Sequence, residues 1–148
     1  MLLTGCSGGI KYVKTIDKTA IYSQEEKSYY VYFYREGCSS CESIAGVVSN
    51  YAKEAKSNTA YIQLYGVKLC TSLEDKGATE PLLYRTYTGA DGEGKKGDYK
   101  VTGVTAWYDL YIGSTPALIK ITHVDGVARS SYVAQGANDI ETLLQNEL

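Results

Sequence analysis

The chain lacks a surplus of either charge and any long apolar run. Its 148 residues carry 15 Lys and Arg against 17 Asp and Glu, so the net charge is −2. No basic surplus is available to neutralise nucleic-acid phosphates, so we expect no nucleic-acid partner. No apolar run approaches the roughly 18 residues that suggest a transmembrane helix. With 44% hydrophobic and 22% charged residues, the composition is that of a globular domain.

Several residue types are also scarce. The chain has one Phe, one Trp, one Met and one His, but 15 Tyr. A tyrosine ring packs like other aromatic rings and keeps a hydroxyl that needs a partner. Tyrosines suit strands and surfaces, and their number alone indicates no particular chemistry.

The four cysteines, Cys6, Cys38, Cys41 and Cys70, are too few for a disulfide scaffold. A second Cys-x-x-Cys or a His pair, which would complete a structural zinc site, is absent, so we expect no metal site. Cys38 and Cys41 form the one close pair. Cys70 alone is more typical of a small buried apolar residue than of a third redox thiol.

A strand–helix–strand unit is predicted around this pair. Residues 10–16 favour a first strand, and the aromatic and β-branched run 28–34 is typical of a strand covered on both faces. Residues 60–64 favour the next strand. Between them, apolar residues recur at helical spacing: Ile44, Val47, Val48, Tyr51, Ala52 and Ala55.

The C-terminal part of the chain favours a hairpin followed by a helix. Residues 117–123 and 127–133 are expected to pair across an Asp-Gly turn. Asn138-Asp139-Ile140-Glu141 indicates a capping box for a last helix to Leu148. A short helix is expected over 107–112. The segment at about 67–104 is polar, and its sequence does not clearly indicate helix or strand.

Two cysteines at a strand-to-helix junction have a physical rationale. Free N–H groups and partial positive charge at a helix start stabilise a thiolate. Placing Cys38 and Cys41 on the first turn brings both sulfurs to one side, within reach of a disulfide. We expect Cys38 to be exposed and to attack, and Cys41 to resolve the mixed disulfide.

The chain resembles the thioredoxin superfamily in three features. These are the aromatic strand ending in Cys38-Ser39-Ser40-Cys41 with its helix, the segment Ser114-Thr115-Pro116-Ala117-Leu118-Ile119, and the closing Asp125-Gly126 hairpin with Gly136 and a helix. A looser resemblance is to bacteriocin transport accessory proteins. The resemblance implies an α/β, thioredoxin-like fold, a central mixed sheet flanked by helices, with an insertion at about 67–104 between the third strand and third helix.

The resemblance also implies an activity, that of a thiol–disulfide oxidoreductase acting on protein or peptide disulfides. Cys38 and Cys41 would be catalytic, and no cofactor would be needed. Pro116 would be cis, which is true of only about 5–6% of X–Pro bonds. Thr115 would offer its backbone to an extended substrate, with Gly37, Ser39 and Ser40 also lining the substrate site.

Some positions depart from the family pattern. Tyr32 stands where the family often has a buried acid, and Gln63 is expected near the position of its partner Lys. A neutral pair would leave Cys41 without a nearby base. The insertion is either a flap beside the redox site or a tolerated surface loop. His123, on a hairpin strand, is expected to face solvent.

An alternative function is a non-catalytic accessory or binding module with a structural Cys38–Cys41 bridge. A metal carrier is a third and weaker option. The sequence leaves the direction of any redox reaction open.

The length predicts one domain over residues 10–148, preceded by a signal-peptide remnant and tether at 1–9. Leu3-Thr4-Gly5-Cys6 resembles the lipobox of bacterial lipoproteins. That resemblance implies lipid on Cys6 and a membrane-anchored protein outside the cytoplasmic membrane. We separately expect the protein to be a monomer. The apolar stretch of a signal peptide is missing before Gly5, so an incidental cysteine is the alternative.

Overall fold

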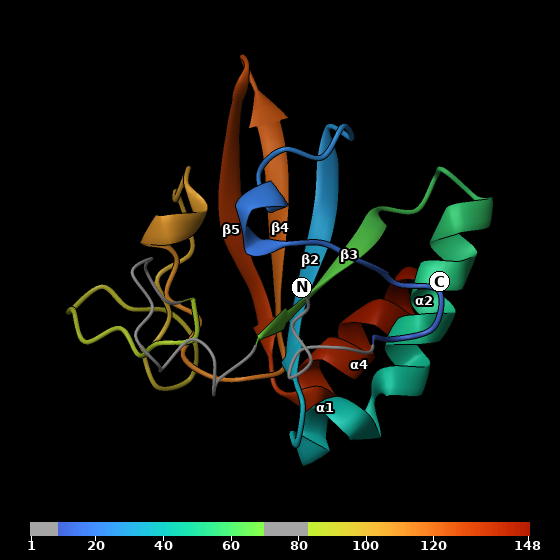
Figure 1. The fold of residues 1–148 in the computed structure, drawn as a ribbon, viewed down its shortest axis with the longest axis horizontal. Helices are drawn as coiled ribbons and strands as arrows, with labels where there is room; N and C mark the ends of the chain where they lie inside the picture. The colour runs from blue at the N-terminus through green and yellow to red at the C-terminus, as the bar shows by residue number, and fades with distance from the viewer. Residues whose placement is uncertain (1–8, 70–82) are drawn as a thin grey trace, which may run out of the picture.

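The fold is α/β, built on one mixed sheet (Figure 1). The computed structural model describes residues 9–69 and 83–148. Within them, five strands lie in the order β1-β3-β2-β4-β5. β3 runs parallel to β1 and β2, while β4 is antiparallel to β2 and β5. The strands are β1 (Lys14–Thr15), β2 (Ser28–Arg35), β3 (Gln63–Leu69), β4 (Ala117–Val124) and β5 (Val127–Gln135).

β2 is the central strand, as its composition predicts. Its six interior residues, 29–34, are all buried, because neighbouring strands pair with it on both sides and packed layers cover both faces. Tyrosine, valine and phenylalanine suit such a strand, since their flat or branched side chains pack well on a pleated surface. Alternate residues of β2 therefore contribute to two separate cores.

Helices cover one face of the sheet. They are α1 (Ser39–Ser43), α2 (Ala45–Ser57) and α4 (Ala137–Glu147). The core on this face contains Tyr30, Tyr32 and Tyr34 of β2 together with Cys38 and Cys41. Figure 1 shows α2 and α4 side by side on this face. The expected amphipathic helix is therefore present, although it breaks at Ile44 into two segments.

Irregular chain covers the other face. Tyr29, Val31 and Phe33 of β2 pack there against chain drawn largely from residues 83–112, which we call the second layer (Figure 1). That layer buries Leu83, Tyr99, Val101, Val104, Leu110 and Ile112. The described part of the expected insertion does not simply lie on the surface, because several of its apolar side chains belong to the core on this face.

Hydrogen bonds attach this layer to the sheet. Ser130 of β5 donates its hydroxyl to the carbonyls of Val101 and Val104, at 2.6 and 3.1 Å. The backbone N–H of Ser130 also donates to Val104, and that of Gly103 donates to Ser130, each at 2.9 Å. These bonds satisfy backbone groups of the edge strand that would otherwise be unpaired.

Several predicted boundaries are wrong. The first strand is confined to Lys14–Thr15, and the helix expected at 107–112 is one 3-10 turn, Trp107–Asp109. The third strand runs to Leu69, because it pairs with β2 as far as Arg35, the last residue of that strand. The last helix begins at Ala137 after Gly136, and no side chain caps it, so the expected capping box does not form.

His123 does not face solvent as expected. Its ring centroid lies 6.0 Å from that of Tyr29, and its Nε2 atom is buried. Cys6 and Cys70 lie outside the described residues, so the predictions made for them stay predictions.

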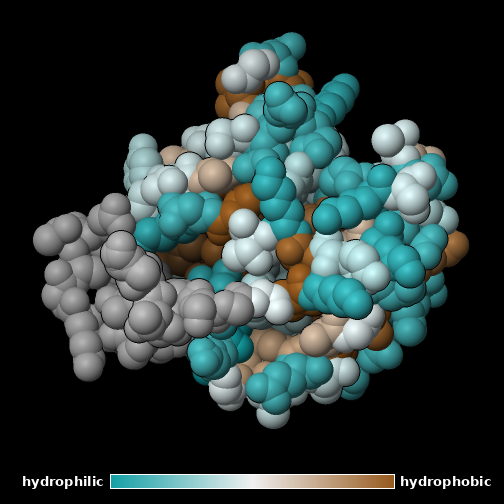
Figure 2. Space-filling view, turned by 45° about the vertical axis from the view of Figure 1, so that its right-hand side comes forward, coloured by the Kyte–Doolittle hydropathy of each residue, from teal (hydrophilic) through white to brown (hydrophobic). Residues whose placement is uncertain are grey.

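The surface is largely polar. The face seen in Figure 2 is mostly hydrophilic, with small hydrophobic areas between polar side chains. Among the described residues, the large hydrophobic side chains that are exposed are Tyr12, Tyr108, Val124, Val127 and Leu148. Over 9–69 and 83–148, no helix has both the length and the apolar character needed to cross a bilayer.

Candidate functional site

Cys38 and Cys41 lie where β2 passes into α1, as the sequence predicts. Gly37 makes the turn with a φ of +75°, a backbone region that L side chains rarely adopt. Cys38 is the N-cap of α1, and its Sγ accepts from the backbone N–H of Cys41 at 3.1 Å. Ser39 and Ser40 are exposed on the first turn. The local backbone therefore places an N–H donor directly on the first sulfur.

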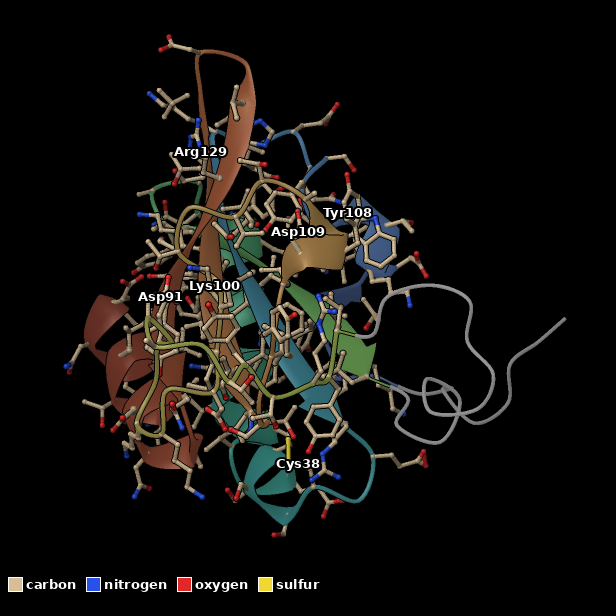
Figure 3. All side chains as sticks on the ribbon, turned by 90° about the vertical axis from the view of Figure 1, so that its left-hand side faces the viewer. Cys38, Asp91, Lys100, Tyr108, Asp109 and Arg129 are labelled. Carbon is tan, nitrogen blue, oxygen red and sulfur yellow. A yellow bond between two sulfur atoms is a disulfide. The ribbon has the colours of Figure 1, made fainter. Side chains whose placement is uncertain are left out.

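The two cysteines form a disulfide, seen as the yellow bond at Cys38 in Figure 3. Their Cα atoms are 5.2 Å apart, within the usual range for a bridge. The pair can therefore close without displacement of the backbone. Figure 3 places it at the opposite end of the molecule from Arg129.

The Thr115–Pro116 peptide bond is cis, which confirms that prediction. Sheet register places it beside the disulfide, because Ala117 of β4 pairs with Phe33 near the end of β2. The two residues that precede Ala117 therefore lie alongside the chain leading to Cys38. Thr115 Oγ1 is 3.5 Å and the Thr115 carbonyl oxygen 3.8 Å from Cys38 Sγ.

Cys38 is not exposed as expected. It is 5% exposed, and Cys41 is 4% exposed. Thr115 contributes to this burial, since both its hydroxyl and its carbonyl contact the Cys38 sulfur.

Tyr32 is buried behind the site, on the face of the sheet that holds both cysteines. It is completely inaccessible to solvent, and its hydroxyl has no hydrogen-bond partner within 9–69 and 83–148. Burial raises the pKa of Tyr32, so the phenol is neutral at physiological pH. It can donate a hydrogen bond but is a poor base.

The expected pairing of Tyr32 with Gln63 is wrong. Gly66 is the residue opposite Tyr32 on β3, and Gln63 lies opposite Tyr29. The Gln63 amide instead donates to the carbonyl of Ala55 at 2.6 Å. Strand register decides this, since β3 begins later than the sequence suggests.

Charged side chains flank the junction on its outer side. The Arg35 guanidinium lies over the Tyr84 ring, 5.3 Å from its centroid, and Glu36 pairs with Lys68 at 3.8 Å. Arg35 ends β2 three residues before Cys38. Tyr84 belongs to the second layer, so that layer reaches the same end of the sheet as the disulfide.

Tyr99 is a residue of the site region that the sequence did not indicate. Its hydroxyl is 2.7 Å from both the carbonyl oxygen and the hydroxyl of Ser114, immediately before Thr115. One tyrosine among 15 carries no signal that would have singled it out. Only the packing of the second layer brings it to this loop.

The structure thus brings Cys38, Cys41, Thr115 and Pro116 together, with Gly37, Ser39 and Ser40 on the connecting turn. Within the described ranges, no three His, Cys, Asp or Glu side chains are grouped so that they could hold a metal ion. Comparison of the sequence with family models and with curated proteins gives no match, so the arguments for function rest on the site itself.

Proposed function

We propose that the protein is a thiol–disulfide oxidoreductase with a thioredoxin-like fold, acting on protein or peptide disulfides. The observation that carries the proposal is the Cys38–Cys41 disulfide at a helix start, facing the cis Thr115–Pro116 bond. Thr115 contacts the sulfur of Cys38 at 3.5 Å. A structural disulfide would need neither a cis-prolyl loop against its first sulfur nor an N–H donor aimed at it.

The topology supports the fold assignment. Three parallel strands in the order β1-β3-β2 continue into the antiparallel pair β4-β5, and α2 and α4 pack on one face. The second face departs from the helical layer that the resemblance implies, because irregular chain fills it. This departure leaves the geometry of the first face, which carries both cysteines, intact.

In the reductive direction, the Cys38 thiolate attacks one sulfur of a substrate disulfide. A mixed disulfide forms, and the first substrate thiolate leaves and takes up a proton. Cys41 then loses its proton and attacks Cys38 Sγ, which releases the second substrate thiolate and closes the Cys38–Cys41 bond. Two electrons pass from the protein to the substrate. The reverse sequence oxidises a substrate dithiol.

Two neighbouring donors support a thiolate at Cys38. The Cys41 N–H lies 3.1 Å and the Thr115 hydroxyl 3.5 Å from the sulfur. Hydrogen bonds to a charged acceptor are roughly twice as strong as neutral ones. Both donors therefore favour the form of Cys38 that attacks.

Insulin reduction coupled to dithiothreitol tests the function. Cys38→Ser removes the attacking sulfur and should abolish turnover. Cys41→Ser removes the resolving thiol and should accumulate a mixed disulfide on Cys38, visible by non-reducing electrophoresis. Cys70→Ser, which removes a cysteine outside the pair, is the control and should keep activity. Turnover by Cys38→Ser at the wild-type rate would refute the proposal.

A structural bridge is the second candidate, and the 4–5% exposure of the two cysteines favours it. The reduction potential separates the two functions. Stable structural disulfides have potentials below about −300 mV. A potential in that range, together with no insulin reduction by the wild-type protein, would establish the structural role.

A further inference from the structure

We infer that Tyr99 is a positioning residue, whose hydroxyl holds the Ser114–Thr115–Pro116 loop against Cys38 and so sets the substrate groove of the proposed oxidoreductase. The inference rests on the proposed function and assigns a role to the second layer of the fold. Tyr99 touches neither sulfur, so its effect is exerted through Ser114 and Thr115.

The contact between Tyr99 and the loop is a reciprocal pair of hydrogen bonds. The Tyr99 hydroxyl donates to the Ser114 carbonyl oxygen at 2.7 Å and can accept from the Ser114 hydroxyl, also at 2.7 Å. The Ser114 carbonyl belongs to the peptide group that precedes Thr115. Fixing that group therefore fixes the backbone next to the cis bond.

Tyr99 is itself rigidly held. It is fully buried, and its ring meets that of Tyr132 edge-on with centroids 5.5 Å apart. Its backbone exchanges two hydrogen bonds with Glu93, at 2.9 and 3.2 Å. Burial raises the pKa of Tyr99 to about 12, so its hydroxyl keeps its proton throughout any ordinary assay range.

The loop transmits this restraint to the disulfide. Thr115 places its hydroxyl 3.5 Å and its carbonyl oxygen 3.8 Å from Cys38 Sγ. On the far side, the Pro116 carbonyl accepts from the Gly136 N–H at 2.9 Å. The loop is thus tied to the second layer before the proline and to the start of α4 after it.

Tyr99→Phe tests the role, because it removes only the hydroxyl. A loosened loop presents a less ordered groove, so KM for a protein disulfide should rise about fivefold with kcat nearly unchanged, the loss expected for one ordinary hydrogen bond. Cys38 should at the same time become more accessible. We therefore expect dithiothreitol to reduce the Cys38–Cys41 bond several-fold faster.

Tyr29→Phe is the matched control. Tyr29 is also fully buried in the same core, and its hydroxyl donates to the Ile21 carbonyl at 2.7 Å. Its register partner on β4, Ile121, lies four residues beyond Ala117, so the lost bond is remote from the prolyl loop. This variant should lose stability like Tyr99→Phe yet keep the wild-type KM and rate of reduction.

Equal kinetics for the two variants would overturn the inference while leaving the proposed function intact. If Tyr99→Phe fails to fold, Ser114→Ala removes the hydroxyl half of the contact, and an unchanged KM and reduction rate in that variant would likewise overturn it. A wild-type protein without insulin reduction would refute the proposed function instead. The dithiothreitol rates of the variants would still decide whether Tyr99 holds the loop.

Discussion

At the scale of single residues, Thr115 acts on Cys38 in two ways. Only 5% of Cys38 is exposed, and Thr115 lies against its sulfur. The same threonine supplies a hydroxyl donor. The two roles of Thr115, covering the sulfur and donating a hydrogen bond to it, can be separated by a substitution that removes the hydroxyl and keeps the size of the side chain.

Thr115→Val keeps the shape of the side chain and removes its hydroxyl. In the reduced protein the Cys38 thiolate would then lose one of two donors and keep only the Cys41 N–H. Hydrogen bonds to charged groups contribute about 1.5–3 kcal/mol, so alkylation of Cys38 by iodoacetamide at neutral pH should slow about tenfold or more.

Thr122→Val is the matched control for this prediction. Thr122 lies on the same strand, and its Oγ1 accepts from the Ser28 hydroxyl at 3.3 Å, far along β4 from the disulfide. Alkylation should proceed at the wild-type rate in this variant. An unchanged rate in Thr115→Val would show that the hydroxyl does not support the thiolate.

At the scale of elements, two glycines show how differently a strand and a helix tolerate added volume. A Cβ on Gly66 of β3 would lie 2.9 Å from Val13 Cγ1 and 3.2 Å from Tyr34 Cε1. A Cβ on Gly46 of α2 would meet nothing within 4 Å. The space beside Gly66 is therefore already occupied by neighbouring side chains, whereas the space beside Gly46 is open.

The same substitution should therefore have opposite effects. Gly66→Ala should lower the free energy of unfolding by about 1–3 kcal/mol, the usual cost of overpacking. Gly46→Ala should raise it by about 0.5–1 kcal/mol, because alanine loses less backbone entropy in a helix. Urea denaturation measures both values. An unchanged free energy of unfolding in Gly66→Ala would mean that Val13 and Tyr34 move easily to make room for the added methyl group.

At the scale of elements, the second layer is also where the fold departs most from the expected sheet flanked by helices on both faces. In its described part, the second layer has no helix apart from the 3-10 turn Trp107–Asp109. Polar contacts between nearby residues take the place of helical hydrogen bonds. The Glu93 carboxylate accepts from the backbone N–H groups of Val101 and Thr102, at 2.8 and 2.7 Å. Lys100 pairs with Asp91 at 2.6 Å on its outer surface (Figure 3).

At the scale of the whole molecule, tyrosines build both cores, and their hydroxyls titrate. Burial raises the pKa of Tyr29 and Tyr99 to about 12, from the usual 10.0. It also raises the pKa values of the following tyrosines: Tyr22, Tyr30, Tyr32, Tyr51 and Tyr65. In every case burial is the largest cause.

The protein should therefore lose stability in alkali. Below pH 10 both states hold these protons, so the contribution of the tyrosines is constant. Between pH 10 and 12 the unfolded chain releases protons that the folded chain retains, so the free energy of unfolding falls as pH rises. Urea midpoints measured across this range should decrease steadily.

Single variants identify the groups responsible. Tyr29→Phe should make the alkaline decrease shallower, whatever its effect on stability at pH 8, because one titrating group is gone. Tyr99→Phe should have the same effect, because burial raises the pKa of Tyr99 equally. An alkaline slope unchanged from wild type in both variants would contradict the assignment of the effect to buried tyrosines.

The local features of the site could be predicted from the sequence. The aromatic run of β2, the Cys38–Cys41 spacing, the hairpin at Asp125-Gly126 and the apolar period of α2 each report on a few neighbouring residues. The cis state of Pro116 followed from resemblance and not from local pattern. Element ends were less predictable, because β1 and β3 take their lengths from the strands that they pair with.

The sequence by itself determined the central strand, the helical segment after it, the closing hairpin and the last helix, and it placed two thiols at a helix start, since backbone preferences and side-chain periodicity act over short distances. The tertiary structure alone decided that Thr115 covers Cys38, that Gly66 lies opposite Tyr32, and that Tyr99 reaches Ser114. Those contacts depend on strand register and on how residues 83–112 fold back over the sheet. Such long-range packing leaves no periodic trace in the chain.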